Sequence, residues 1–203
     1  MSNFNMGGIG KINGGQYDNM NIEGVSSCSS DIKAQNIHIE GVFTCSGEVQ
    51  AETLYCEGVC DFKANIRTNT LTVEGVLNEK EGTKIEAQRI DCDGVIRTNG
   101  EIYADVLNAN GCVTAKEIYG DQIKINTHVS FSRFKKFINS VKSEIKLIEA
   151  TTVELSGVMV DTINAQDIKI GPNCRVDSID CNGTLSIDSS STVKSITGNY
   201  TKL

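Results

Sequence analysis

The sequence predicts an all-β protein, a single-stranded parallel β-helix of about ten turns built from a 17-residue repeat. Two observations in the pattern predict this fold: a short motif recurs every 17 residues, and apolar residues alternate with polar ones inside each repeat. That alternation has the period of two that strands with one buried face show. The composition agrees, since one proline, no tryptophan and 19 glycines suit a narrow interior made of stacked layers.

The repeat is clearest at its glycine corners. A glycine follows an acidic residue at positions 17 residues apart, and the pattern continues after a two-residue expansion between Asn78 and Lys84. These glycines are Gly24, Gly41, Gly58 and Gly75, followed by Gly94 and Gly111. Glycine fits a corner because the chain changes direction there without a side chain in the way. A unit of this length is too short to hold a helix as well as strands.

Stacking the repeats produces four inward-facing columns. Isoleucine and valine dominate three of them, as a pleated surface prefers, and the remaining one consists of small residues. The first column runs from Ile32 through Ile163 to Val176 and Val193, the second from Ala34 to Ser195, the third from Ile37 to Ile168, and the fourth from Ile39 to Cys181. Because each turn bonds to its neighbours, we expect the two end turns to carry unpaired backbone groups and an exposed apolar layer.

The domain organisation follows from these columns. We expect a flexible Gly- and Asn-rich N-terminal tail at 1–15 and a solenoid over 16–203, interrupted by an insertion at about 129–147. The tail lacks the basic start and apolar stretch of a signal peptide, and no apolar run approaches the ~20 residues of a membrane span. The net charge of −7 argues against nucleic acid as a partner. We therefore expect a cytoplasmic protein whose eight cysteines are thiols.

No residue pattern predicts catalysis, a cofactor or a metal site. The chain has no CxxC pair, and His38 and His128 are not at metal-ligand spacing from any cysteine. Several cysteines fall in inward columns, where small buried hydrophobes are expected. The segment Gly7-Gly8-Ile9-Gly10-Lys11 fails the phosphate-loop pattern at both of its ends.

Two further enzyme classes are disfavoured. Acyltransferases on β-helices use a six-residue period and a base, and neither histidine has an obvious acidic partner in the sequence. Carbohydrate-active β-helices gather acids and aromatic platforms on one face, whereas here the tyrosines are scattered, although Tyr103 and Tyr119 fit adjacent turns. Glu40, Glu57 and Glu74 stack at one corner, where a solvated turn is favoured over a cation site because exposed like charges are screened.

The insertion has a composition of its own. Five basic residues and one acidic residue lie between Phe131 and Lys146. Apolar residues there follow helical spacing and give an apolar stripe beside a basic face. They are Phe131, Phe134, Ile138, Val141 and Ile145. The residues predicted to make contacts are Phe131, Arg133, Phe134, Lys135, Lys136, Phe137 and Ile138.

Three partners remain open for the insertion. It can lie on an anionic membrane surface as a short amphipathic helix, it can pack against the flank of the solenoid, or it can bind a protein partner. A single short segment binds a membrane weakly, but in a polymer many weak contacts add up.

The corner motifs and the C-terminal stretches together resemble the bactofilins, a family of bacterial polymer-forming cytoskeletal proteins. The resemblance covers nearly the whole chain from about Tyr17. It rests on the E-G-V units that follow Ile39, Cys56 and Val73, and on the stretches 148–155, 167–174 and 181–187. The basic insertion and the abbreviated final turns depart from the most compact members of the family.

The resemblance implies a right-handed β-helix that assembles end to end into filaments without nucleotide and scaffolds client proteins, often at the inner face of the cell membrane. The expected partners are therefore other copies of the chain, an anionic membrane surface and cytoplasmic clients. The residues expected at the polymer contacts are Tyr17, Met20 and Ile22 at one end and Val193, Ile196 and Tyr200 at the other. The alternative is a monomeric or dimeric adaptor that presents the basic insertion to a membrane or partner, and an enzyme is the weaker third hypothesis.

Overall fold

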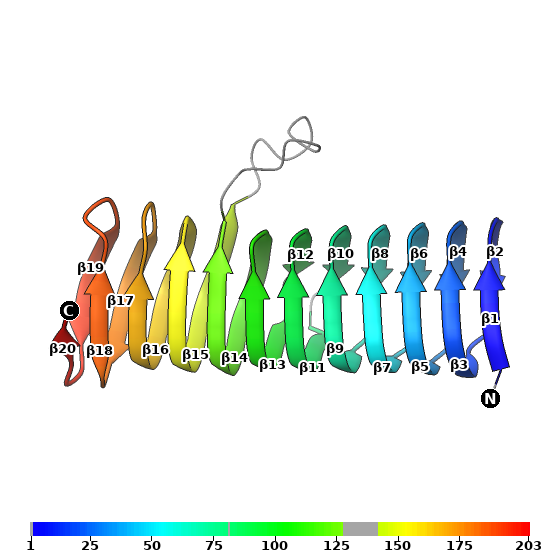
Figure 1. Ribbon diagram of the computed structural model, residues 1–203, viewed down its shortest axis with the longest axis horizontal. Helices are drawn as coiled ribbons and strands as arrows, with labels where there is room; N and C mark the ends of the chain where they lie inside the picture. Colours follow the sequence, from blue (N-terminus) through cyan, green and yellow to red (C-terminus); the bar gives the residue numbers. More distant parts are fainter. Residues whose placement is uncertain (1, 81, 128–141) are drawn as a thin grey trace.

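The computed structural model describes residues 2–80, 82–127 and 142–203. Throughout these residues the regular elements are strands, which stack in parallel into a right-handed β-solenoid of about 11 turns (Figure 1). The spacing of about 17 residues per turn and the all-β fold confirm the prediction from the sequence.

Most turns contain one long strand and one short strand. The strands are β1 (Ser2–Met6), β2 (Ile9–Ile12), β3 (Gly15–Ile22), β4 (Val25–Cys28), β5 (Ile32–Ile39), β6 (Val42–Cys45), β7 (Val49–Cys56), β8 (Val59–Phe62), β9 (Ile66–Val73), β10 (Val76–Glu79), β11 (Lys84–Cys92), β12 (Val95–Thr98), β13 (Glu101–Ala109), β14 (Cys112–Asn126), β15 (Ser143–Ser156), β16 (Val158–Ile170), β17 (Arg175–Cys181), β18 (Thr184–Ile187), β19 (Thr192–Thr197) and β20 (Thr201–Lys202).

Each turn has three short inward-facing stretches. In β5 the alternation of buried and exposed residues is interrupted by two consecutive exposed residues, Gln35 and Asn36, which mark a change of direction within the strand. The glycine corner at Gly41 then leads into β6, which supplies the last stretch. The buried side chains of this turn are Ile32, Ala34, Ile37, Ile39, Phe43 and Cys45.

The predicted columns match the observed register through the N-terminal and middle turns. Ile32 pairs with Val49 and Val49 with Ile66, and the same column passes through the centre of the rod to Ile148 and Ile163. All of its members up to that point are buried. The interior is therefore a set of straight apolar stacks.

The last turns correct two of these columns. The sequence analysis placed Val176 after Ile163 and Cys181 after Ile170, but the turns beyond the insertion contain fewer residues at their corners, so counting from the earlier repeats misplaces them. The observed pairs are Val160 with Val176, Ile163 with Ile179, Ala165 with Cys181 and Ile170 with Ile187. The first column therefore continues into Ile179 and Ile196.

The N-terminal segment is also different from the prediction. Residues 2–12 form β1 and β2, which stack on β3 and β4 as one more turn, where a flexible tail at 1–15 was expected. Asparagine ladders fix this turn in register: Asn19 Nδ2 donates to Asn3 Oδ1 at 2.9 Å, and Asn21 Nδ2 donates to Asn5 Oδ1 at 2.9 Å. Glycine and asparagine indicated disorder because the ladder that they form requires the neighbouring turn.

The conserved spacing of the corner glycines has a steric cause. A Cβ atom on Gly41 would lie 1.9 Å from the carbonyl oxygen of Gly24, and one on Gly58 would lie 1.8 Å from that of Gly41. Successive corners therefore stack so closely that a side chain cannot fit between them.

The cysteines line the interior. Six are unpaired and buried, as the prediction of small buried hydrophobes requires. Cys56 and Cys60, on either side of the Gly58 corner with Cα atoms 6.7 Å apart, are joined by a disulfide in the structure. The expectation that all eight are thiols is therefore wrong for this pair, because both side chains turn inward at the same corner.

The insertion leaves from the middle of the rod. β14 and β15 pair directly with each other, so the segment between them joins two adjacent strands inside the stack and does not begin at a tip. Residues 143–147, which the prediction assigned to the insertion, belong to β15, and Ile145 is buried in the core. The predicted contact residues at 131–138 lie outside the described residues.

Candidate assembly interface

The first turn forms the N-terminal tip of the rod. Among the described residues, β1 pairs with β3 and β2 pairs with β4, each on one side. The opposite edges of β1 and β2 thus present backbone N–H and C=O groups without a strand partner. Ile9 is 89% exposed at this tip, while Phe4 and Met6 pack partly against the core. The tip offers both hydrogen-bonding edges and apolar surface.

The residues expected at this tip lie one turn deeper. Met20 pairs with Phe4 and Ile22 pairs with Met6, and both are fully buried. Tyr17 contacts the Phe4 ring, with centroids 5.6 Å apart, and donates to the carbonyl of Asn13 at 2.7 Å. The prediction that Met20 and Ile22 form the exposed layer is wrong because the presumed tail covers them.

The C-terminal tip is formed by β19 and β20. Within the described chain these strands pair with β17 and β18 on one side. Ile196 is 36% exposed, Tyr200 is 37% exposed and Leu203 is 77% exposed, while Val193 is partly buried. The structure places Val193, Ile196 and Tyr200 on the last turn, where the sequence analysis expected them.

The two tips are compatible in chemistry. Each ends in strands of the same direction and the same spacing as the turns inside the rod, so one tip can add to the other as a further turn does. Such a head-to-tail contact is heterologous, and it produces an open filament when the rotation does not close a ring.

A buried acid lies in the interior and was missed by the sequence analysis. Glu79 is 7% exposed and occupies the inward position that Phe62 takes on one neighbouring turn and Thr98 on the other. Burial raises the pKa of its carboxyl group to about 7, an effect that the hydrogen bond from Thr98 Oγ1 at 2.7 Å partly offsets. Its spacing of 17 residues from Phe62 was the available signal.

A shallow groove on the flank is the best place for the enzyme hypothesis. It has a volume of about 550 Å³, and the rings of Tyr103 and Tyr119 stack beside it with centroids 4.9 Å apart. Charged side chains of the groove already pair: Arg67 contacts Glu86 at 2.8 Å and Lys84 contacts Glu101 at 2.8 Å. These ion pairs occupy the groups that acid–base chemistry would need, so the groove favours no reaction.

One cluster on the flank has the donor types of a metal site. His38 lies within 4 Å of two carboxylates, Glu40 on the same turn and Glu57 on the next. The sequence analysis expected no metal site and no acidic partner for either histidine. The available signal was that residues 38 and 40 share one face of the chain while 40 and 57 are one repeat apart.

The described residues contain no helix with the length and apolarity that a membrane crossing needs. The predicted membrane or partner contacts, Phe131, Arg133, Phe134, Lys135, Lys136, Phe137 and Ile138, remain a prediction from the sequence, since they lie outside the described residues.

Comparison of the chain with protein-family models, with curated proteins and with solved structures found no match in any of the three. The resemblance to bactofilins therefore stays a prediction.

Proposed function

We propose that this chain is a self-assembling scaffold of the bactofilin kind, which polymerises by stacking the ends of its β-solenoids without nucleotide. The observation that carries the proposal is that the described chain leaves both tips as one-sided strands with exposed apolar side chains, Ile9 at one end and Leu203 at the other. Solenoids that stay monomeric usually cover such tips with polar caps.

The energetics of tip contact favour concentration-dependent assembly. Each 100 Å² of apolar surface removed from water contributes about 2.5 kcal/mol, and each backbone hydrogen bond adds on the order of 1 kcal/mol. Association costs about 4–15 kcal/mol in lost freedom of motion. A joint that repeats the interior stacking can exceed this cost because it buries one whole layer.

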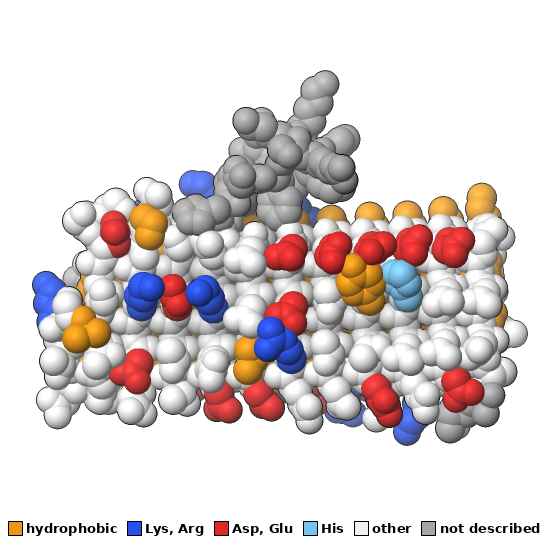
Figure 2. All heavy atoms as spheres, viewed as in Figure 1, with side chains coloured by type: hydrophobic (Ala, Val, Ile, Leu, Met, Phe, Trp, Pro, Cys, Tyr) orange, Lys and Arg blue, Asp and Glu red, His pale blue; other side chains and the backbone are white. Residues whose placement is uncertain are grey.

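The flanks support end-to-end rather than side-by-side contact. A row of exposed acidic side chains runs along one edge of the rod (Figure 2), formed by the corner residues Glu23, Glu40, Glu57, Glu74 and Asp93. With a net charge of −7, two rods brought together along these edges repel each other. The tips carry less charge.

Charged substitutions at the tips test the proposal. We expect Phe4→Lys and Ile196→Lys each to shift the protein from polymers to short soluble species, because each places a charge in the layer that stacking would bury. Light scattering and size-exclusion chromatography over a concentration series measure the shift. The matched control is Val42→Lys, on the flank, because Val42 is 38% exposed and Ile196 is 36% exposed.

Two results would oppose end stacking. If both tip variants polymerise like the wild type, the tips are not the joints. If Val42→Lys abolishes assembly as strongly as the tip variants do, the joint lies on the flank.

We further propose that the polymer is cytoplasmic and associates with the membrane through the basic Phe-rich segment. The support is its sequence alone: three phenylalanines at 131, 134 and 137 beside Arg133, Lys135 and Lys136. We expect the Phe131/Phe134/Phe137 triple serine variant to pellet less with anionic liposomes than the wild type does, since it loses the apolar side chains that anchor the segment. Equal pelleting would leave the membrane out of its function.

A further inference from the structure

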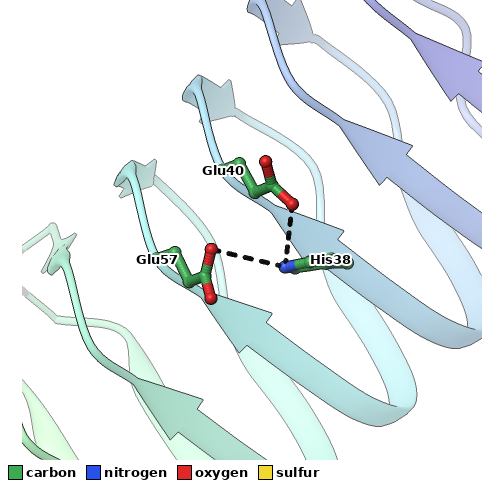
Figure 3. A group of neighbouring side chains, drawn as sticks. All are labelled: His38, Glu40 and Glu57. Atoms are coloured by element: carbon green, nitrogen blue, oxygen red, sulfur yellow. Dashed lines mark ion pairs between the residues drawn. The ribbon is translucent and has the colours of Figure 1, made fainter.

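The flank of the rod carries a histidine whose ring nitrogen faces two carboxylates. His38 Nε2 lies 3.7 Å from Glu40 Oε1 and 3.8 Å from Glu57 Oε2 (Figure 3). The three donor atoms lie within 4.8 Å of one another. Glu40 belongs to the corner after β5, and Glu57 to the corner after β7, so the cluster spans two consecutive turns.

The environment of the ring nitrogen calls for a cation. His38 Nε2 is shielded from solvent and has no hydrogen-bond partner, and its distances to the two carboxylates are longer than those of an N–H···O hydrogen bond. A neutral imidazole nitrogen that carries a lone pair would face two negative charges without compensation. A positive ion between the three atoms removes this conflict, whether that ion is a proton or a metal.

The position of His38 in the fold holds the ring in place. The outward side chains along this line of the rod are stacked one above another, so the His38 ring lies against Tyr55, with centroids 4.9 Å apart. Tyr55 in turn donates from its hydroxyl to Glu74 Oε1 at 2.6 Å. The ring is thus packed on a tyrosine that is itself tied to the acidic edge, which limits its rotation.

We propose that His38, Glu40 and Glu57 form a binding site for one divalent transition-metal ion of the zinc type. One imidazole nitrogen and two carboxylate oxygens are a donor set that suits zinc. At bond lengths of about 2.0–2.2 Å, neighbouring ligand atoms around such an ion are about 3–3.5 Å apart. The two glutamates need to close by only a few tenths of an ångström, which their exposed side chains allow.

The bound ion would link two turns of the solenoid. Its charge would offset the repulsion between neighbouring rungs of the acidic edge, and its bonds would join Glu40 to Glu57 across the turn boundary. The side chains of the three ligands are 37%, 50% and 39% exposed, so water completes the coordination from the open side. The site lies on the flank, and its formation does not depend on assembly at the tips.

Zinc chloride titrated into the full-length chain by isothermal calorimetry tests the site. We expect one zinc ion per chain and a rise in the melting temperature when zinc is present, because an ion that binds the folded state stabilises it. His38→Asn and Glu57→Gln should each weaken binding at least tenfold, about what the loss of an outer-shell partner alone costs. The His38→Asn variant should fold, since asparagine already occupies this line of the rod at Asn5 and Asn21.

The matched control is Glu23→Gln, which removes the same charge from the same edge outside the cluster and should change zinc affinity by less than about twofold. The proposal is overturned if the wild type does not bind zinc, or if His38→Asn binds it as tightly. It is also overturned if Glu23→Gln weakens binding as much as Glu57→Gln, or if magnesium competes equally with zinc, since either result means diffuse attraction to the acidic edge.

Discussion

Glu79 shows at the scale of one residue how the stacked interior acts on a side chain that does not suit it. Its column contains Phe62 on one side and Thr98 on the other, and its Oε1 atom has no hydrogen-bond partner. The carboxyl group is therefore easier to keep protonated than to ionise, and its pKa rises from 4.5 to about 7.

The raised pKa predicts a pH-dependent stability. Between the unfolded value near 4.5 and the folded value near 7, the folded state holds a proton that the unfolded state has lost, so the free energy of unfolding falls as the pH rises through this window. The loss is on the order of 3 kcal/mol, from about 1.4 kcal/mol per pKa unit.

We expect Glu79→Gln to raise the free energy of unfolding at pH 8.5 and to flatten the fall between pH 5.5 and 8.5, the sides of the window set by burial. Urea denaturation at the two pH values measures both effects. Glu23→Gln, an exposed acid on the flank, is the control. An unchanged pH dependence in Glu79→Gln would mean that the carboxyl group is not the source.

At the scale of an element, the corner is the most constrained part of each turn. The Gly58 corner lies so close to the Gly41 carbonyl that a Cβ atom would have to approach it to 1.8 Å. Backbone on both sides is held by strand pairing, since β8 lies between β6 and β10, so neither turn can move away freely.

The Gly58→Ala substitution should therefore destabilise the fold by about 1–3 kcal/mol or more, as overpacking does. The free energy of unfolding in urea is the measurement. Gly8→Ala is the matched control, because nothing lies within 4 Å of the Cβ atom that it adds. A similar cost for both would indicate a general effect of losing glycine rather than the corner contact.

The elements differ in how far the sequence predicted them. Repeating apolar pairs such as Ile32 with Val49 were predictable because one residue count applies from turn to turn. β1 and β2 were not, since Asn3 and Asn5 look like a polar tail until their ladder partners Asn19 and Asn21 are placed beside them. Cys181 was misplaced because the turns shorten after the insertion, and the sequence does not show which corner lost residues.

The candidate sites were predictable to a smaller extent for the same reason. The stacking of Glu40 and Glu57 followed from the repeat, but their convergence on His38 Nε2 depends on side-chain directions that a residue count does not contain. At the tips, the repeat correctly placed Ile196 on the last turn, while the start of the first turn depended on whether residues 2–12 joined the stack.

At the scale of the whole molecule, the rod is a one-dimensional stack in which each layer contacts its neighbours above and below. Such a stack has no internal reason to stop at a particular number of layers. Where the described chain ends, the next layer can come from another copy, and the acidic edge then becomes continuous along the polymer.

Electron microscopy of the purified protein over a concentration series, without nucleotide, tests end stacking most directly. We predict filaments whose images show the strand spacing of about 4.8 Å along the filament axis, together with a longer axial repeat of about 50 Å from the ~11 layers of one copy. Separate rods about 50 Å long at every concentration, or filaments whose strand spacing runs across the axis, would contradict it.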